Sequence, residues 1–552
     1  MKLYFLLPLV TFCCVCSLVS SAQDVTETTR FTRADTLRGT LTPLRTCYDV
    51  KFYHLDVKFD LADRFISGSN RFKFAAVSDF NRLQFDLFEN LHVDSVVYRS
   101  GKLPFKREAN AVFVSFPENI KKGSSDEFTV FYSGHPTVTK RAPRDGGVVF
   151  STDAAGKPFV ATACEGTGAS IWWPNKDHLS DEVDSMLISI SVPTGLKNVS
   201  NGRLQQITDL KNGYTRFDWY VANPINNYNV AANIGDYTHF SDTYKGEGGL
   251  LNLDYWVLPE NKEKAVPQFK KSVPQMLAAF EYWFGPYPFY KDGYKLVDVP
   301  YPAMEHQGAI GYGGFLKGFP PNEMHAVGRK EVWDFIIVHE SAHEWFGNNI
   351  TAKDLADLWI HESFGTYAES LFIEYLYGKQ AGQDYVAQNR AHIKNESAIV
   401  APYHMNKMGS GEMYGKGSVL LNMVRIIIND DVKWRKILRG LNAQFRHQTV
   451  TYADIVNYIS LQSGEKLNTI FDQYLRFKDI PKLELSTVKG ELNCRWIADV
   501  KDFNMPIRLK LKDAEYQWIY PSSKFKPLGI SGATKDNVEI DTANFLVKVE
   551  VR

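Results

Sequence analysis

The sequence predicts a multidomain α+β protein, and three observations support this class. The chain has 552 residues, more than a single hydrophobic core usually organises, so several domains are expected. Apolar and polar residues alternate over much of 48–240, whereas helical periodicity dominates from about 328 to 475. From 479 onward the sequence returns to short strand-like runs. We therefore expect a mainly antiparallel β domain, a mostly helical domain and a small C-terminal β domain, in that order.

The first 22 residues have the pattern of a secretory signal. Lys2 precedes a long apolar run, and the small residues Ser20, Ser21 and Ala22 end it. This order predicts cleavage after Ala22 and export to the periplasm or the extracellular space. An uncleaved membrane anchor is the alternative, because the run is nearly long enough to span a bilayer. No later stretch has transmembrane character, so we expect no stable membrane insertion after cleavage.

Residues 23–46 are predicted to form an extended lead-in, because they are polar and threonine-rich without a sustained period. The β domain is assigned to 47–240. The stretch "HLDVKFD" (54–60) alternates as a half-buried strand does, and "RLQFDLF" and "MLISISVP" continue this texture. Turn signals such as "SGS" and "SNG" separate the runs, as expected between antiparallel strands.

The helical domain is assigned to 241–478. Its first pattern, "NKEKAVPQFKKSVPQMLAAFEYWFG", predicts a helix that Pro267 and Pro274 interrupt or start. A strand at 294–299 follows, and then the glycine-rich "GAIGYGGF". We interpret this glycine-rich stretch as a loop, because it matches no phosphate-binding pattern. Residues 479–552 form the predicted C-terminal β domain.

Composition excludes several partners. Lys and Arg together number 63, and so do Asp and Glu, so no global field draws the protein to nucleic acid or to an anionic membrane. The mature chain would keep Cys47, Cys164 and Cys494, which allow at most one disulfide. Buried free thiols are the better interpretation of these three residues.

Two histidines four residues apart, in "VHESAHEW" (338–345), predict half of a metal site. In a helix, His339 and His343 lie on one face with Cβ atoms about 5–6 Å apart. Their imidazoles can then meet one zinc ion at roughly 2.0–2.1 Å. Glu340 faces the neighbouring side, where its carboxylate can reach a metal-activated water without binding the metal. An ordinary helix with two solvated histidines is the alternative.

Glu362 is the candidate third ligand, nineteen positions after His343 in the helical stretch "ADLWIHESFGTYAES". Two histidines and a glutamate leave the fourth zinc position open for water, which is the catalytic arrangement. Glu369 follows seven residues later, two helical turns along the same face. It suits a hydrogen-bond partner of a zinc-bound histidine, although a plain surface glutamate is nearly as good an interpretation.

This spacing resembles that of the zinc aminopeptidases of the aminopeptidase N type, a gluzincin family. Their signature is H-E-x-x-H, eighteen intervening residues and a glutamate, which matches "HESAHEWFGNNIT" and "LWIHESFGTYAE" here. Thermolysin-like endopeptidases carry their third ligand one residue later. The resemblance implies one Zn²⁺ per chain, held by His339, His343 and Glu362.

Three further motifs extend the resemblance over roughly residues 45 to 480. In "PAMEHQ", Glu305 matches the acid that binds the substrate's free α-amino group, and Ala303 is assigned to substrate binding. In "YGKG", Tyr414 matches the tyrosine that donates a hydrogen bond to the tetrahedral oxyanion. The segment "TACEGTGASIWWPNKD" resembles the one that carries a second amine anchor, which assigns that role to Glu165.

The "PAMEHQ" motif departs from the family at two positions. Pro302 stands where the family has glycine, and His306 stands where it has asparagine. Proline has no N–H, so any substrate contact made by that glycine's amide is lost. Amine recognition by Glu305 should survive, in a pocket of altered shape.

The resemblance implies a zinc-dependent aminopeptidase that hydrolyses the N-terminal peptide bond of peptides with a free amine. Glu340 is the expected general base for the metal-activated water, and Tyr414 is expected to stabilise the oxyanion. The implied fold is an N-terminal β saddle domain, a thermolysin-like catalytic domain and a small C-terminal β-sandwich. Many relatives add a helical domain that covers the cleft. Because the chain ends at Arg552, we expect a more open site.

Two other functions compete with this one. A zinc endopeptidase would cleave peptides whether or not the N-terminus is blocked. A catalytically inactive relative would use the scaffold for binding alone. Loss of Glu340, Tyr414 or a metal ligand would indicate the inactive relative, and all of these residues are present.

Overall fold

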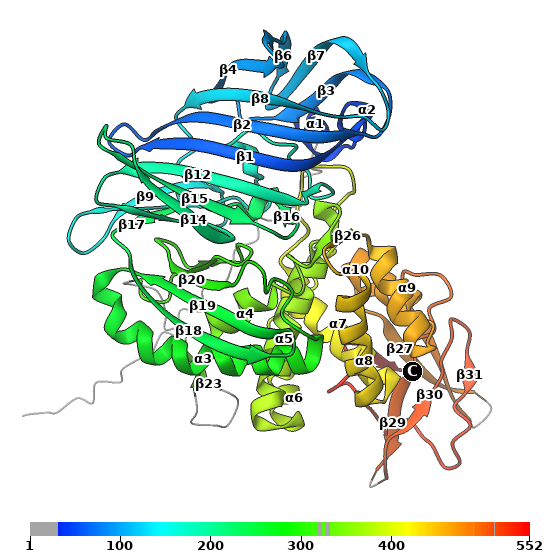
Figure 1. Ribbon diagram of the computed structural model, residues 1–552. Helices are drawn as coiled ribbons and strands as arrows, with labels where there is room; N and C mark the ends of the chain where they lie inside the picture. Colours follow the sequence, from blue (N-terminus) through cyan, green and yellow to red (C-terminus); the bar gives the residue numbers. More distant parts are fainter. Residues whose placement is uncertain (1–30, 317–322, 326–331, 489–490, 513) are drawn as a thin grey trace, which may run out of the picture. The chain divides into compact units, whose positions relative to one another are not determined.

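The computed structural model describes residues 31–316, 323–325, 332–488, 491–512 and 514–552 (Figure 1). The predicted signal at 1–22 and the start of the predicted lead-in lie outside the described residues. Among the described residues, no helix is both long enough and apolar enough to cross a membrane. Cys47, Cys164 and Cys494 are buried free thiols, as predicted.

The N-terminal β region is built on an eight-stranded sheet with the order β14-β15-β12-β1-β2-β8-β4-β5 (Figure 1). Its strands are β1 (Tyr48–Asp60), β2 (Phe65–Ala76), β4 (Leu91–Tyr98), β5 (Gly101–Lys102), β8 (Ser125–Gly134), β12 (Ser185–Pro193), β14 (Arg203–Asp209) and β15 (Tyr214–Val221). Neighbours pair in antiparallel fashion except β1 and β12, which run parallel. The predicted alternation in "HLDVKFD" holds, because Leu55, Val57 and Phe59 are all buried.

Smaller sheets complete this region. A three-stranded sheet contains β3 (Phe80–Asp86), β7 (Ala111–Ile120) and β6 (Phe105–Glu108). A four-stranded sheet contains β13 (Lys197–Val199), β17 (Asn233–Gly235), β10 (Pro158–Ala163) and β9 (Gly147–Thr152). Strands β11 (Glu182–Val183) and β16 (Ile225–Asn226) pair separately. Strand β10 matters for the site, because Glu165 follows its end.

The part of the lead-in that the structure describes is helical, and the prediction of an extended segment was wrong there. Helix α1 spans Arg33–Gly39 and helix α2 spans Pro43–Thr46. Thr32 and Asp35 form a capping box, in which each side chain accepts from the other's backbone N–H. Pro43 occupies the first turn of α2, where a missing N–H costs nothing. These caps nucleate helices too short to show a hydrophobic period.

The catalytic region begins with a five-stranded sheet of order β18-β19-β20-β22-β21. Its strands are β18 (Thr238–Gly246), β19 (Gly249–Val257), β20 (Tyr294–Asp298), β21 (Ala303–Met304) and β22 (Ile310–Tyr312). The predicted strand at 294–299 is β20. The glycine-rich stretch predicted as a loop contains β22, whose pairing with β20 and β21 overrides its weak strand propensity. Strand β21 lies at the edge of the sheet.

Helix α3 (Lys262–Phe284) connects β19 to β20 and continues through both predicted interruptions. Pro267 and Pro274 lie inside the helix, seven residues apart. Its opposite face buries Phe269, Val273 and Phe280 in the core, with Phe269 against the ring of Tyr255 from β19. Burial of this apolar stripe therefore outweighs the cost of two prolines.

The remaining helices form the body of the catalytic region (Figure 1). They are α4 (Phe335–Ala342), α5 (Trp359–Tyr377), α6 (Lys379–Arg390), α7 (Glu412–Ile428), α8 (Asp431–Gln444), α9 (Tyr452–Ser463) and α10 (Asn468–Arg476). Short strand pairs accompany them: β23 (Glu323–His325) with β24 (Val332–Asp334), and β25 (Ile350–Ala352) with β26 (Gln448–Val450).

The C-terminal region consists of two small sheets, as the strand-like runs predicted. One has the order β31-β28-β27-β33 and the other has the order β30-β29-β32. Their strands are β27 (Lys482–Val488), β28 (Glu491–Ile497), β29 (Ile507–Leu511), β30 (Gln517–Ile519), β31 (Lys526–Pro527), β32 (Val538–Ile540) and β33 (Lys548–Val551). The multidomain α+β class is therefore confirmed, whereas the exact domain boundaries remain predictions.

Candidate metal centre and active site

The histidine pair lies on α4, which is shorter than the sequence pattern suggested. Residues 332–334 form strand β24, and the helix begins only at Phe335. Asp334 caps the helix by accepting a hydrogen bond from the N–H of Ile337. His343 is the C-terminal cap and keeps helical backbone angles. The expected i, i+4 relation therefore holds, with the rings of His339 and His343 5.0 Å apart between centroids.

Both imidazoles are oriented by their Nδ1 atoms. His339 Nδ1 lies 2.7 Å from Oε1 of Glu369, and His343 Nδ1 lies 3.0 Å from the carbonyl oxygen of Phe346. These partners only accept hydrogen bonds, so each Nδ1 carries the proton and each Nε2 keeps a free lone pair. Glu369 itself is buried and also accepts from the hydroxyl of Tyr385 at 2.5 Å. The alternative of a surface glutamate at 369 is excluded.

Glu362, in the first turn of α5, completes the donor set. Its Oε2 atom lies 3.7 Å from Nε2 of His339 and 3.7 Å from Nε2 of His343. Ligands bound to one tetrahedral zinc at the usual distances are separated by about 3.3–3.4 Å, so only small shifts are needed. The same Oε2 is buried without a hydrogen-bond partner. An orphaned carboxylate oxygen facing two free lone pairs fits a bound cation, and zinc suits this donor set.

Glu340 and Tyr414 face the same site from two helices. Glu340 is buried beside His339 on α4. Tyr414, in the first turn of α7, places its ring 6.3 Å from the ring of His339. The tyrosine is 38% exposed, so a molecule in the site can reach it. The geometry brings both residues to the metal ligands, as the motifs predicted.

Glu165 and Glu305 form a carboxylate pair next to this centre. Glu305 follows the edge strand β21, and its Oε1 accepts a hydrogen bond of 3.1 Å from the hydroxyl of Tyr228. Asn348 fixes the same residue by donating to its carbonyl oxygen at 2.8 Å. Burial, followed by repulsion from Glu305, raises the pKa of the Glu165 carboxyl well above its usual value. Burial also raises the pKa of Glu305. A ligand cation would offset both costs.

His361 lies next to Glu165 and Glu305, and the sequence did not predict this position. One of its ring nitrogens, one oxygen of Glu165 and one of Glu305 lie within 4.8 Å of one another. The N–H of Ala352 donates to His361 Nε2 at 2.8 Å, so the ring proton must sit on Nδ1. Nδ1 is buried without a partner. A protonated nitrogen cannot bind a metal, so this cluster is a poor second metal site. The Nδ1–H group of His361 is instead available as a hydrogen-bond donor.

The "PAMEHQ" motif contains β21, the edge strand of the five-stranded sheet. Ala303 pairs with Tyr312 of β22 on one side only, which leaves its other side open to an extended peptide. The carbonyl oxygen of Pro302 accepts from the N–H of Gly313 at 2.9 Å. His306 is fully buried, and both of its ring nitrogens lack a partner among the described residues. Burial lowers the pKa of His306 to about 3, so the ring is neutral.

Three residues of the site were missed because no motif gave them a role. Tyr228, Asn348 and His361 act through contacts that join separate segments, and a single sequence does not show such contacts. Asn348 and His361 had a local signal, since they lie within "HESAHEWFGNNIT" and "LWIHESFGTYAE".

Comparisons with known proteins agree with this geometry. Residues 268–474 match the family model of the peptidase family M1 domain. The chain is 23% identical to leucyl aminopeptidase of Saccharolobus solfataricus over 448 residues, which cover 76% of this chain and 54% of that protein. It is 25% identical to aminopeptidase N of Canis lupus familiaris over 314 residues, which cover 52% of this chain and 32% of that protein. The chain therefore spans about half or less of the length of these curated relatives.

A solved structure shows the same fold. It is a variant of the M1 zinc metallopeptidase of Deinococcus radiodurans, bound to a Tyr-Ser-Ala substrate. The TM-score is 0.64 at 20% sequence identity, and the match covers 79% of this chain and 95% of that one.

The fold is that of a solved M1 zinc metallopeptidase, and the three donors of the site could hold a zinc ion. More particularly, residues 268–474 match the peptidase family M1 domain, and the predicted resemblance to the zinc aminopeptidases of the aminopeptidase N type is confirmed. The relatives that it resembles include a leucyl aminopeptidase and an aminopeptidase N.

Proposed function

We propose that this protein is a zinc aminopeptidase that removes the first residue from peptides with a free N-terminal amine and holds one zinc ion per chain. One observation carries the proposal: the carboxylates of Glu305, which is buried, and Glu165, which is half-buried, lie near the converging donors of His339, His343 and Glu362. Such a pair is costly unless a cation joins it. The α-ammonium group of a peptide is a cation that lies one residue from its first peptide bond.

Glu340 and Tyr414 are the residues to which we assign the chemical steps. When bound, zinc supplies a Lewis acid and lowers the pKa of water to about 7. Glu340 accepts the proton of the attacking water and later delivers it to the leaving amine. The hydroxyl of Tyr414 donates a hydrogen bond to the oxyanion, whose charge exists only near the transition state. His339, His343 and Glu362 hold the metal, and Glu369 fixes the orientation of His339.

Substrate position follows from the edge strand and the carboxylate pair. The open side of β21 at Ala303 can pair with an extended peptide backbone. Glu305 and Glu165 then bind the ammonium group and fix which peptide bond reaches the metal. The names of two relatives, leucyl aminopeptidase and aminopeptidase N, support the same reaction. The Tyr-Ser-Ala substrate of the Deinococcus radiodurans enzyme supports peptides as substrates.

The test compares two enzymes on two substrates: unmutated protein and Glu305→Ala, each with a peptide and with its N-acetylated form. Acetylation removes the positive charge and leaves the carboxylates unpaired, a loss of about 2–5 kcal/mol for such pairs. This corresponds to roughly 30- to 4000-fold in kcat/KM, at 1.4 kcal/mol per decade. Glu305→Ala should lose a comparable factor on the free peptide and should barely distinguish the two substrates.

Two results would contradict the proposal. Equal cleavage of free and acetylated peptides by the unmutated protein would favour the endopeptidase. No cleavage by zinc-loaded protein would favour the inactive relative. Glu340→Gln serves as the control for contaminating peptidases, because it should retain zinc and lose turnover.

A further inference from the structure

Backbone hydrogen bonds around Glu165 help to hold this residue in place. It lies on a tight turn, residues 164–168, between β10 and a short 3₁₀ helix at Ala169–Ile171. We call this segment the anchor turn. The N–H of Thr167 donates to the carbonyl of Glu165, and that of Gly168 donates to the carbonyl of Cys164, both at 2.7 Å. Because Oε1 of Glu165 is buried without a partner, the position of this carboxyl depends on the turn.

Arg38, at the end of α1, clamps the anchor turn from outside. Its Nη2 donates to the carbonyl oxygen of Thr167 at 2.5 Å and pairs with Oδ2 of Asp177 at 2.8 Å. The two charged side chains are only 8% and 9% exposed. Gly168 has a φ of +94°, and a Cβ there would collide with both the guanidinium and the Asp177 carboxylate. The turn is therefore shaped to accept this ion pair.

Asp177 connects the clamp to the 3₁₀ helix that follows the turn. Its carboxylate accepts from the N–H groups of Ala169 and Ser170, at 3.3 and 3.1 Å, and from the Ser170 hydroxyl. Arg38 thus contacts the anchor turn directly at Thr167. Through Asp177 it also contacts the first residues of the 3₁₀ helix, Ala169 and Ser170. Without the guanidinium, the Thr167 carbonyl would lose its donor and Asp177 would keep an uncompensated buried charge.

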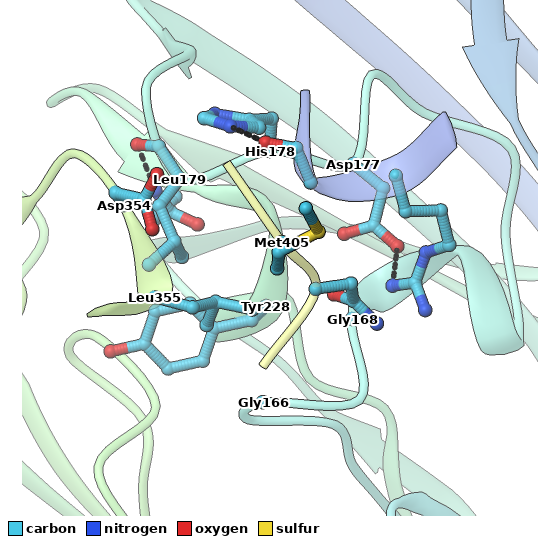
Figure 2. Close-up of a pocket in the computed structure, with 13 residues that line it drawn as sticks. Gly166, Gly168, Asp177, His178, Leu179, Tyr228, Asp354, Leu355 and Met405 are labelled. Atoms are coloured by element: carbon cyan, nitrogen blue, oxygen red, sulfur yellow. Dashed lines mark hydrogen bonds and ion pairs between the residues drawn. The ribbon is translucent and has the colours of Figure 1, made fainter. Parts of the chain in front are cut away.

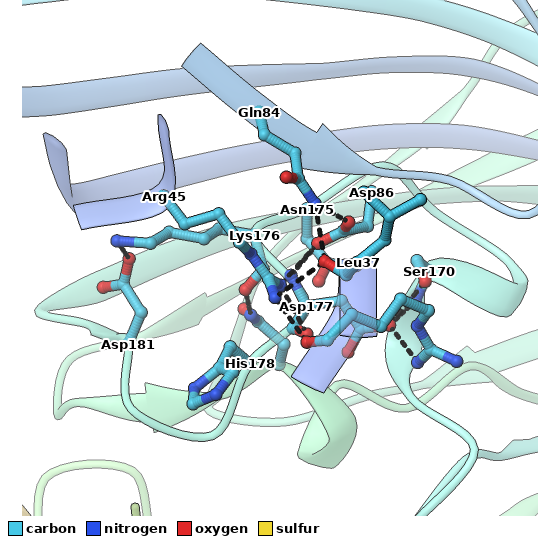
Figure 3. Close-up of polar contacts among 12 residues, drawn as sticks. Leu37, Arg45, Gln84, Asp86, Ser170, Asn175, Lys176, Asp177, His178 and Asp181 are labelled. Carbon is cyan, nitrogen blue, oxygen red and sulfur yellow. Dashed lines mark hydrogen bonds and ion pairs between the residues drawn. The ribbon is translucent and has the colours of Figure 1, made fainter. Parts of the chain in front are cut away.

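Helix α1 is itself fixed on the β region (Figure 3). The fully buried Arg45 pairs with Asp86 at 2.7 Å and donates to the carbonyl of Asp177 at 2.8 Å. Arg45 also donates to the carbonyl of Arg38, and Gln84 donates to that of Leu37 at 2.9 Å. The Asp177 N–H donates to Asp86 at 3.0 Å. Arg38 therefore projects from a rigid base.

The same helix also contacts the loop that leads to Tyr414. The Thr40 hydroxyl donates to the carbonyl of His404 at 3.0 Å, and the Asn406 N–H donates to the carbonyl of Asp35 at 3.3 Å. Gly39 lies so close to the Met405 backbone that a Cβ would overlap it. A cavity of ≈ 30 Å³ remains between these segments, bordered by Tyr228, Gly166 and Met405 (Figure 2). This cavity has room for water only, so the direct contacts fix the position of α1 relative to residues 404–406.

We propose that Arg38 is a positioning residue for amine recognition: it holds the anchor turn so that Glu165 faces Glu305 and the incoming ammonium group. This inference rests on the proposed aminopeptidase function. It assigns a role in that function to α1, a segment outside the catalytic region and far from the zinc ligands in sequence. The amine contact exists in the bound ground state as well as in the transition state. Loss of the clamp should therefore raise KM and leave kcat nearly unchanged.

The experiment measures kcat and KM for Arg38→Ala, Arg38→Lys and the unmutated protein, on a free peptide and on its N-acetylated form. We expect Arg38→Ala to raise KM for the free peptide by on the order of 10- to 100-fold, which corresponds to about 1.4–2.8 kcal/mol of lost ammonium binding. The preference for free over acetylated peptide should fall by a similar factor. Arg38→Lys keeps the charge beside Asp177 without the planar fork, so its effect should be smaller.

Arg33→Ala is the matched control, because Arg33 lies on the same helix in an exposed pair with Glu108. It should leave KM unchanged. Zinc content should be equal in all variants, since no metal contact is altered. An unchanged KM in both Arg38 variants, or a loss confined to kcat, would overturn the positioning role. If the unmutated protein does not prefer the free amine, the aminopeptidase proposal fails instead. If Arg38→Ala does not fold, Arg38→Lys decides the question.

Discussion

Individual residues at this site combine an unusual number of buried acids. Glu165, Glu305, Glu340 and Glu362 lie near one another, and repulsion among them contributes to the raised pKa of Glu165. In the proposed function, zinc and a substrate ammonium together would supply three positive charges to these acids. Both ligands would then offset the cost of the cluster, which would favour their binding.

Tyr414→Phe tests the oxyanion assignment at the scale of one atom. Removal of the hydroxyl deletes a donor that meets charge only in the transition state, so kcat should fall by about 10²–10³. KM should change little, because the charge is absent from the bound peptide. Steady-state kinetics on a free-amine peptide measure both constants. An unchanged kcat would remove Tyr414 from the reaction.

Glu369→Gln tests how far the metal site extends beyond its ligands. The amide can still accept from His339 Nδ1, but it lacks the charge that makes the imidazole a better donor to the metal. Zinc affinity should fall by roughly 10- to 100-fold, the usual effect of such partners. Competition against a chromogenic chelator measures the affinity. Glu263→Gln, at an exposed position of α3, is the control and should bind zinc as the unmutated protein does.

At the scale of helices and strands, long periodic patterns predicted the fold and short elements escaped prediction. The alternation in β1 was sufficient because one face of this strand is buried over many residues. The long apolar stretch of α5 was sufficient too, and residues 359–373 of this helix are all buried. Helix α1 was missed because seven residues held by a capping box have no period to detect. The three residues of β24 were assigned to a helix, because their pairing with β23 is a tertiary effect that the local sequence does not show.

The residues of the candidate site also differ in how far the sequence could predict them. His339, His343 and Glu340 could be predicted because helical spacing converts sequence distance into geometry. Glu362 lies on a second helix, and its distance from His343 became informative through the family signature. Glu165, Glu305 and Tyr414 lie on separate elements, and only the resemblance to a family connected them. Tyr228, whose contact with Glu305 spans 77 residues, had no such support.

Helix α3 offers a test of element stability. Pro267 is exposed in the interior of this helix and cannot donate to the carbonyl four residues earlier. A helix-interior proline costs about 3 kcal/mol relative to alanine, partly offset by the stiffer unfolded chain. Pro267→Ala should therefore raise the free energy of unfolding by about 1–3 kcal/mol.

Urea denaturation followed by tryptophan fluorescence measures this change. Pro286→Ala is the matched control, since Pro286 follows the helix and its replacement adds only freedom to the unfolded chain. It should be neutral or slightly destabilising. A lower midpoint for Pro267→Ala would mean that the helix is adapted to its proline.

At the scale of the whole molecule, the site lies where two hydrophobic cores meet. The residues that flank Glu165, Cys164 and Ala169 among them, belong to the core of the N-terminal β region. Those that support the zinc donors, such as Val338 and Phe364, belong to the core of the catalytic and C-terminal regions. Amine recognition and metal binding thus depend on different cores, and the peptide would lie across both.

Zinc itself should stabilise the folded protein, because its three ligands come from two helices and are not preassembled in the unfolded chain. A ligand that binds only the folded state adds about 4 kcal/mol when its free concentration is 1,000 times Kd. Thermal unfolding of zinc-loaded and chelator-treated protein should therefore differ, with the chelated form melting at a lower temperature. His343→Ala should melt at one temperature in both conditions, since it has lost a ligand. Glu340→Gln should keep the full difference, because its carboxylate moves protons and holds no metal. A Glu340→Gln variant insensitive to the chelator would show that Glu340 is a ligand, and the division of roles between the neighbours His339 and Glu340 would be wrong.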